Sequence, residues 1–144
     1  MSLRGAWRYA WASPATLLGL LLAGACLAGG GRARVVGGVL EVGGGSPWRA
    51  LRRTRWPWRF DAITLGHVVL AESDATLQAC RVHERVHVRQ YERFGPTFFL
   101  IYAASSIREH LRGGDAYRDN RFEREAFAEE RRHAAPRTPV RRGK

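Results

Sequence analysis

The sequence has little cysteine, almost no lysine and few acidic residues. Its two cysteines, Cys26 and Cys80, lie far apart in different settings, so neither indicates a disulfide framework. Lys144 is the only lysine, and arginine supplies the rest of the 24 basic residues against 13 acidic ones, for a net charge of +11. A strongly basic chain is attracted to nucleic acid or to anionic lipid. Charge alone does not separate these two partners.

The chain is also too short for two domains. Its 144 residues, 45% of them apolar, suffice for one domain with a modest core, and no internal repeat is evident. We divide the sequence into an apolar, membrane-seeking segment (1–31), a metal-binding domain (32–133) and a basic tail (134–144). The tail is rich in proline and arginine, and we expect it to be disordered.

Residues 14–30 contain no charged residue. Such a run of about 17 residues is at the lower limit for a helix that crosses a hydrocarbon core of ~30 Å. We predict an apolar helix that stays attached to membrane lipid through residues 14–30, either across the bilayer or in its plane. A cleaved signal peptide, a lipoprotein signal ending at Cys26 and a buried core helix are the alternatives. Arginines lie on both sides of the run, so they do not orient it.

Two segments have the composition of β-strands. Residues 34–42 predict a hairpin that turns at Gly37 and Gly38, a pair that can adopt positive φ angles. Residues 62–71 are rich in β-branched side chains and predict one or two strands, broken or bulged at Gly66. Together they predict a small antiparallel sheet.

Tryptophan and arginine alternate between Pro47 and Arg59. Trp48, Trp56 and Trp58 stand among five arginines, a mixture that suits a lipid headgroup layer or stacking on nucleic acid bases. With an apolar segment upstream, the membrane surface is the favoured interpretation.

Three helices are predicted in the second half of the chain. The first runs from Asp74 to Phe94, because Ser73 or Asp74 can cap its start and Gly95-Pro96 can end it. The second covers 96–112 and is too short to span a bilayer. The third covers 121–133 and can be capped by Asn120.

The motif His83-Glu84-Arg85-Val86-His87 lies in the middle of the first of these helices. Residues four apart on a helix lie one above the other, so both histidines can bind one metal ion, with Zn–N distances of about 2.0–2.1 Å. Glu84, turned by about 100° from His83, can take a proton from a water molecule that the ion activates. The motif therefore contains most of a hydrolytic site.

A zinc site of this type needs a third protein ligand, and Glu123 is the best candidate. It falls inside the apolar arc of the last helix, whereas Glu125 falls outside. Glu123 also stands three residues after Asn120, so it could instead complete a capping box. Glu125 and His67 stay open as alternative ligands. The other histidines, His110 and His133, are expected to be solvated.

Two stretches carry a resemblance to a known family. The segment Ala62 to Gln90, a strand followed by HERVHVRQ, resembles small bacterial zincin-like domains of the HExxH class. The stretch NRFEREAFAEE, Asn120 to Glu130, is similar to the third-ligand helix of gluzincins such as the CAAX prenyl protease type. There a Glu is followed three positions on by Ala and then usually Asp; Glu123 and Ala126 fit, and Phe127 stands in place of the Asp.

The resemblance implies an α+β fold: a minimal zincin-like domain with a small antiparallel sheet, the HExxH helix and two further helices, after an apolar N-terminal helix. It implies Zn²⁺ on His83, His87 and Glu123, with Glu84 as the catalytic base. By analogy, the strand around 64–69 presents its edge to an extended peptide substrate. Tyr102 or Tyr117 is a candidate to stabilise an oxyanion.

These features predict a zinc-dependent peptidase, or a peptidase-like protein, at the bacterial inner membrane. One alternative is a degenerate zincin that acts as a membrane-surface scaffold, since the missing Asp would orient a ligand histidine. The other is a basic protein that binds nucleic acid. The sequence does not specify the substrate, the side of the membrane, the oligomeric state or whether the site is catalytically active.

Overall fold

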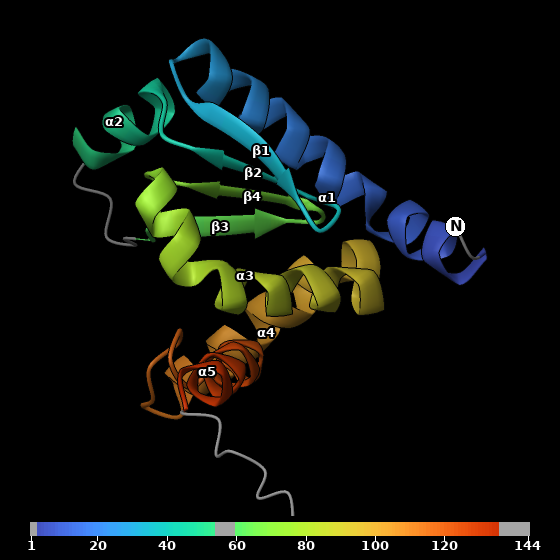
Figure 1. The fold of residues 1–144 in the computed structure, drawn as a ribbon. Helices are drawn as coiled ribbons and strands as arrows, with labels where there is room; N and C mark the ends of the chain where they lie inside the picture. Colours follow the sequence, from blue (N-terminus) through green and yellow to red (C-terminus); the bar gives the residue numbers. More distant parts are fainter. Residues whose placement is uncertain (1–2, 54–59, 136–144) are drawn as a thin grey trace, which may run out of the picture.

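Helices and short strands follow the order that the sequence predicts, with one additional helix. The computed structural model describes residues 3–53 and 60–135 (Figure 1). The elements are α1 (Leu3–Ala28), β1 (Arg32–Val36), β2 (Val39–Gly43), α2 (Ser46–Arg53), β3 (Ala62–Leu65), β4 (Val68–Ala71), α3 (Asp74–Phe94), the 3₁₀ turn η1 (Gly95–Thr97), α4 (Phe98–Leu111) and α5 (Arg121–Ala134). The fold class is α+β, as predicted, and α2 is the addition.

The described strands form one four-stranded sheet in the order β1-β2-β4-β3. Two hairpins build it, and the first turns at Gly37 and Gly38, whose φ angles are positive (52° and 78°), as predicted. The predicted break at Gly66 is the turn of a second hairpin, where Gly66 also has a positive φ (62°). The expectation of a purely antiparallel sheet is wrong, because β2 pairs with β4 in parallel. All four residues of β4 are buried, which suits an interior strand, whereas β3 begins with half-buried residues and takes the edge.

Helices cover both faces of this sheet (Figure 1). Successive side chains of β4 point to opposite faces, so its residues divide between two core clusters. One cluster joins the sheet to α1 and α2 through Ala23, Cys26, Val42, Trp48, Val68 and Leu70. The other joins it to α3 through Val39, Val69, Ala71, Leu77 and Val88. The sheet therefore lies between α3 and the C-terminal half of α1, whereas the start of α1 packs directly on α3 through Ala12, Ala15 and Tyr91.

The apolar N-terminal helix is present as α1, and residues Tyr9–Ala28 are long and apolar enough to cross a membrane. By length and composition alone, a signal sequence or the core helix of a soluble protein passes the same test. The face that α1 turns toward the protein consists of small, buried residues, among them Ala12, Ala15 and Ala23. This face lets the backbone of α1 approach the sheet closely.

The later helices begin and end near the predicted residues. Ser73 caps α3 by accepting a hydrogen bond from the Thr76 N–H, and Gly95 ends the helix with a φ of 57°. The next helix begins later than predicted, because residues 95–97 form a 3₁₀ turn. Asn120 caps α5, since its side-chain oxygen accepts from the Phe122 N–H.

The tryptophan-rich segment differs from its prediction where the structure describes it. Trp48 lies in α2 and is only 7% exposed, packed in the core cluster against the sheet, so the interpretation that it faces headgroups or bases is wrong. Burial of its large indole ring in the cluster that contains Val42 and Leu70 stabilises the fold more than placement of the ring at a surface would. Trp56, Trp58 and the tail from residue 136 lie outside the described residues.

Candidate metal centre

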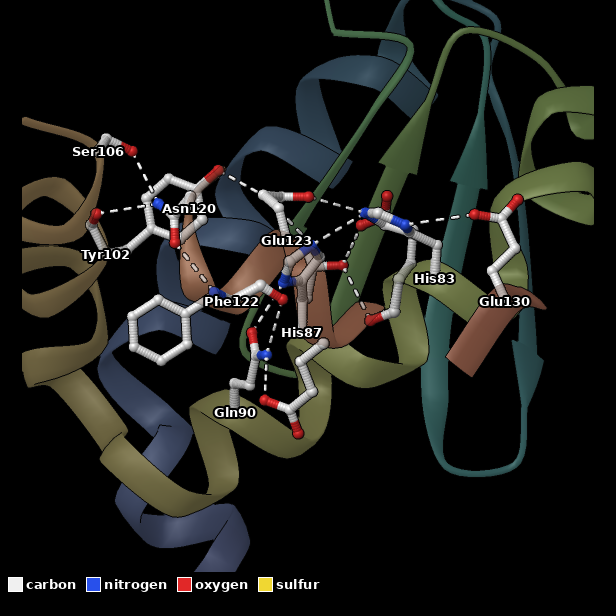
Figure 2. A network of polar contacts seen from close by, with 12 residues as sticks. His83, His87, Gln90, Tyr102, Ser106, Asn120, Phe122, Glu123 and Glu130 are labelled. Carbon is white, nitrogen blue, oxygen red and sulfur yellow. Dashed lines mark hydrogen bonds and ion pairs between the residues drawn. The ribbon is translucent and has the colours of Figure 1, made fainter. Parts of the chain in front are cut away.

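Helix α3 places His83 and His87 side by side, as their spacing predicts. Their Nε2 atoms are 3.2 Å apart. Both residues are buried, with exposures of 6% and 8%, because this face of α3 turns toward α5 and α4 rather than toward solvent. Figure 2 shows both rings pointing toward the same place.

Glu123 enters the same place from α5 (Figure 2). Its Oε2 lies 3.0 Å from Nε2 of His83, and its Oε1 lies 3.3 Å from Nε2 of His87. The capping alternative is not realised, because Asn120 caps α5 with its own side chain and Glu123 turns away to the histidines. One donor atom from each of the three residues lies within 4.8 Å of the others, so the group could hold a metal ion.

The spacing of these donor atoms suits a tetrahedral ion. A tetrahedron with metal–ligand bonds of about 2.05 Å has edges of about 3.3 Å between ligands. The separation of 3.2 Å between the two Nε2 atoms is close to that edge, and each of these nitrogens has a different oxygen of Glu123 nearby, at 3.0 Å for His83 and 3.3 Å for His87. Two imidazole nitrogens and one carboxylate oxygen, all within 4.8 Å of one another, could therefore supply three of the four ligands, and the fourth would be a water molecule or substrate.

Electrostatics couples the carboxylate to the two imidazoles. Burial alone would raise the pKa of Glu123, but hydrogen bonds with His83 and His87 lower this pKa to about 2. Burial would likewise lower the pKa of His87, and the Glu123 carboxylate reverses the effect and raises it. The ionised carboxylate thus attracts positive charge to the centre of the cluster.

Gln90 fixes the orientation of His87. Its side-chain N–H group donates to the Phe122 carbonyl (3.2 Å) and to the Glu125 carboxylate (3.0 Å), so its oxygen faces His87 Nδ1 at 2.9 Å. Nδ1 must then donate, which leaves the lone pair of Nε2 facing the cluster. Glu125 consequently supports Gln90 and is not a ligand. Gln90 was not predicted as a site residue, although its position three residues after His87 on the buried face of the helix is a usable signal.

His83 has a different support. Phe127 packs its ring against His83 with ring centroids 4.8 Å apart. A carboxylate still approaches, because Glu130, one turn later on α5, lies 3.6 Å from His83 Nδ1 (Figure 2). This distance is that of an ion pair and is too long for a hydrogen bond.

Glu84 lies beside the cluster and is held by the sheet. It is 7% exposed, and its Oε2 accepts a hydrogen bond of 2.6 Å from the Thr64 hydroxyl on the edge strand β3. Thr64 is a second site residue that was not predicted from the sequence. The contact requires β3 to lie alongside α3, which the sequence pattern does not reveal.

Of the two candidate tyrosines, Tyr102 has a direct contact with the cluster. Its hydroxyl donates to Glu123 Oε1 at 2.6 Å, and burial together with the Glu123 charge raises its pKa. Burial, followed by the charge of Glu123, also raises the pKa of Tyr117, whose ring packs against Phe127. Both phenols therefore stay protonated and can donate hydrogen bonds.

The remaining histidines lie elsewhere. His67 is buried in the β3–β4 turn, where its Nε2 pairs with Glu92 at 3.2 Å and its ring stacks on Tyr9, so it is not the third ligand. His110 and His133 are exposed, as predicted.

Fold and cluster together define an α+β domain with a buried His-His-Glu group that could bind a metal ion. In comparisons with known proteins, no family model matches this chain, and no curated protein or solved structure matches it significantly.

Proposed function

We propose that this chain is a membrane-attached, zinc-dependent peptidase. The observation that carries the proposal is a set of three metal donors, His83, His87 and Glu123, that lie close together. A further buried carboxylate, Glu84, directly follows His83 on α3. A zinc ion held there supplies Lewis acidity, which lowers the pKa of a water molecule and polarises a carbonyl. The remaining steps belong to the residues of the chain.

The donor set favours zinc over harder or softer ions. Imidazole with one carboxylate suits zinc, whereas magnesium and calcium prefer oxygen alone. The nearby thiol does not compete, because burial and the Glu84 charge raise the pKa of Cys80 to about 12. Cys80 instead donates to the Thr76 carbonyl at 2.9 Å.

Glu84 is proposed as the general base. Its carboxylate accepts the proton of the attacking water and then delivers that proton to the leaving amine. Thr64 holds one oxygen of this carboxylate, so the side chain does not have to be ordered during the reaction. Tyr117, which is protonated, is a candidate to donate to the developing oxyanion, whereas Tyr102 would first have to release its hydrogen bond to Glu123.

An extended peptide is the substrate class that the sheet supports best. Among the described strands β3 is an edge strand, and the same strand carries Thr64, which touches Glu84. A peptide that pairs with the free edge of β3 would bring its carbonyl groups alongside the cluster. The resemblance to zincin-like domains implies the same mode.

Metal analysis and one substitution test the proposal. Purified protein should contain one zinc ion per chain and cleave unstructured peptides. Glu84→Gln should retain the zinc and lose activity by roughly 10²–10⁴-fold, because only the proton transfer is removed. Absence of zinc, or equal turnover by the wild type and Glu84→Gln, would sink the proposal.

A non-catalytic role is the second candidate, and Phe127 favours it. Because an aromatic ring replaces the carboxylate that would orient His83, the ion could serve only to join α3 to α5. Stable zinc binding and unfolding on chelation, with no cleavage of any peptide in a diverse library, would support this scaffold role.

A further inference from the structure

Helix α1 is built into the fold along most of its described length. A Cβ atom on Gly19 would lie 2.7 Å from Cβ of Val68 and 2.9 Å from the Leu65 carbonyl oxygen, so no side chain fits between α1 and the sheet. Toward its start, Ala12 and Ala15 pack against Tyr91 and other aromatic residues of α3, α4 and α5. Toward its end, Ala23 and Cys26 belong to the core cluster on the sheet.

The opposite face of α1 consists of exposed leucines. Leu21 is 74% exposed and Leu17 is 62% exposed, and both lie about 160–200° around the helix from Gly19. The flanking leucines are exposed by 42–46%: Leu18, Leu20, Leu22 and Leu27. We call these six residues the leucine face. No charged residue interrupts α1 from Tyr9 to Ala28, so the leucine face is apolar throughout.

Crossing a bilayer is incompatible with this packing. A spanning α1 would take the attached sheet into the hydrocarbon, including the edge strand β1 with its exposed Arg32 and half-buried Arg34. Backbone groups at an open sheet edge find no hydrogen-bond partners in lipid, and open edges do not occur there. An α1 that lies parallel to the membrane avoids this conflict, because only its outer face enters the lipid.

Positive charge gathers where α1 ends. Arg49 of α2 is exposed and donates from Nη2 to the Gly29 carbonyl at 3.1 Å, which places a guanidinium at the C-terminal end of α1. Arg32, the first residue of β1, and Arg53, the last residue of α2, are exposed as well. An apolar helix face beside exposed arginines complements an acyl layer covered by anionic headgroups.

We infer that α1 lies in the plane of an anionic membrane, with the leucine face in the acyl boundary and the metal centre on the opposite side of the sheet, toward water. The inference specifies the membrane attachment in the proposed function and does not rest on its zinc chemistry. It also implies that α1 is retained, since its removal would open two core clusters. Peptides would then reach the metal centre from the aqueous phase.

Vesicle binding tests the leucine face. The full chain should bind vesicles that contain phosphatidylglycerol more tightly than vesicles of phosphatidylcholine alone, and added salt should reduce this difference. The double variant Leu17→Ser/Leu21→Ser should bind on the order of tenfold or more weakly. Leu111→Ser, which changes a leucine that is 79% exposed on α4, is the matched control and should bind like the wild type.

Zinc content separates this inference from the proposed function. The double variant should keep its metal and its thermal stability, because both leucines are exposed. If the protein lacks zinc but binds vesicles through the leucine face, the proposed function fails and the inference stands. If the double variant binds vesicles normally but converts a dimer to a monomer, a second copy of the chain covers this face and the inference is overturned.

Depth measurements distinguish an in-plane helix from a spanning one. Spin labels are attached one at a time at Ala10→Cys, Leu17→Cys, Leu21→Cys and Ala28→Cys, which share the outer face, in a Cys80→Ala background; the native Cys26 is buried. An in-plane α1 should give similar shallow depths at all four positions. Deep labels at the two central positions with shallow labels at both ends would show a spanning helix and overturn the inference.

Discussion

In the candidate metal centre, Glu123 is the donor that α5 contributes beside the two histidines of α3. Glu123→Gln should weaken zinc binding by more than the roughly 10–100-fold that loss of a supporting residue costs. A chromophoric chelator in competition with the protein measures the affinity. Glu125→Gln, two residues away, removes no donor and should retain zinc; equal losses in the two variants would contradict the ligand assignment.

Substitution of Gln90 is a second test of the zinc site, because Gln90 would affect zinc binding only through its contact with His87. Its removal frees His87 Nδ1 and lets the ring rotate, so Gln90→Ala should lower zinc affinity by about 10–100-fold. Gln78 is exposed on the same helix, so Gln78→Ala should leave the zinc affinity unchanged. The role assigned to Gln90 is wrong if the two variants bind zinc equally well.

The site residues differ in how far the sequence could reveal them. His83 and His87 were predicted because a helix fixes their relation within five residues, and Glu123 because it lies in an apolar arc. Thr64 was not assigned to the site, and the approach of Glu130 to His83 was not predicted, since these contacts depend on how strands and helices pack against one another. Contacts made across elements are tertiary facts that local periodicity does not contain.

Two glycines of α1 test how closely this helix packs on the sheet, because Gly19 faces the sheet and Gly24 does not. Gly19→Ala places a Cβ against Val68 and the Leu65 carbonyl and should destabilise the protein by about 1–3 kcal/mol. Gly24 has no atom within 4 Å of such a Cβ, so Gly24→Ala should be neutral or stabilising. Thermal unfolding in mild detergent compares them. Equal melting temperatures would show that α1 does not pack on the sheet.

A buried ion pair network fastens the β1–β2 hairpin to α3. Glu41, 1% exposed, accepts from Arg81 at 2.9 and 3.0 Å and from Arg34 at 2.9 Å. Burial would raise the pKa of Glu41, but these two guanidinium groups lower it below its ordinary value of 4.5. The network therefore stabilises the fold above about pH 4.5, and this contribution is lost as the pH falls through the lowered pKa.

Glu41→Gln should cost about 2–3 kcal/mol at neutral pH, less than a fully buried pair, because the side chains of Arg34 and Arg81 are each 34% exposed. The difference from the wild type should shrink as the pH is lowered below about 4. Denaturant unfolding at several pH values measures both effects. Glu109→Gln breaks surface pairs and should cost about 1 kcal/mol or less. A Glu41→Gln cost that stays constant with pH would contradict the assignment.

The helix ends and the first hairpin could be predicted because the residues at those positions carry local signals. Ser73, Gly95 and Asn120 set helix ends through their own caps, and paired glycines set the first hairpin. The parallel pairing of β2 with β4 could not be read in the same way, because it depends on which strand of the second hairpin is buried on both faces. Helix α2 was missed because three of its eight residues are arginine, its second residue is Pro47, and its burial rests on Trp48.

In the whole molecule, α2 and the C-terminal half of α1 cover one face of the sheet, and α3, which carries the two histidines of the candidate metal centre, covers the other. The start of α1 also packs on α3 and α5 through Ala12 and Ala15, so α1 belongs to the core on both sides, and its leucine face lies outside. Apolar composition alone could not separate a spanning helix from one packed on a sheet, because both need a long uncharged run. The distinction came from the small residues along one face of α1, which only the docked sheet makes significant.

Zinc should stabilise the entire fold, because the ion would join α3 to α5 where the apo protein relies on the ion pairs of Glu123 with His83 and His87. At a free zinc concentration a thousandfold above Kd, binding contributes about 4 kcal/mol. For a domain of this size, that corresponds to a rise in Tm on the order of 10 °C. Calorimetry with and without a chelator measures the shift, and hydrogen exchange should show α5 losing protection first.

Glu84→Gln should behave like the wild type, whereas Glu123→Gln should melt at the apo temperature whether or not zinc is added. A wild-type Tm that is unaffected by chelation would show that no ion bridges the two helices.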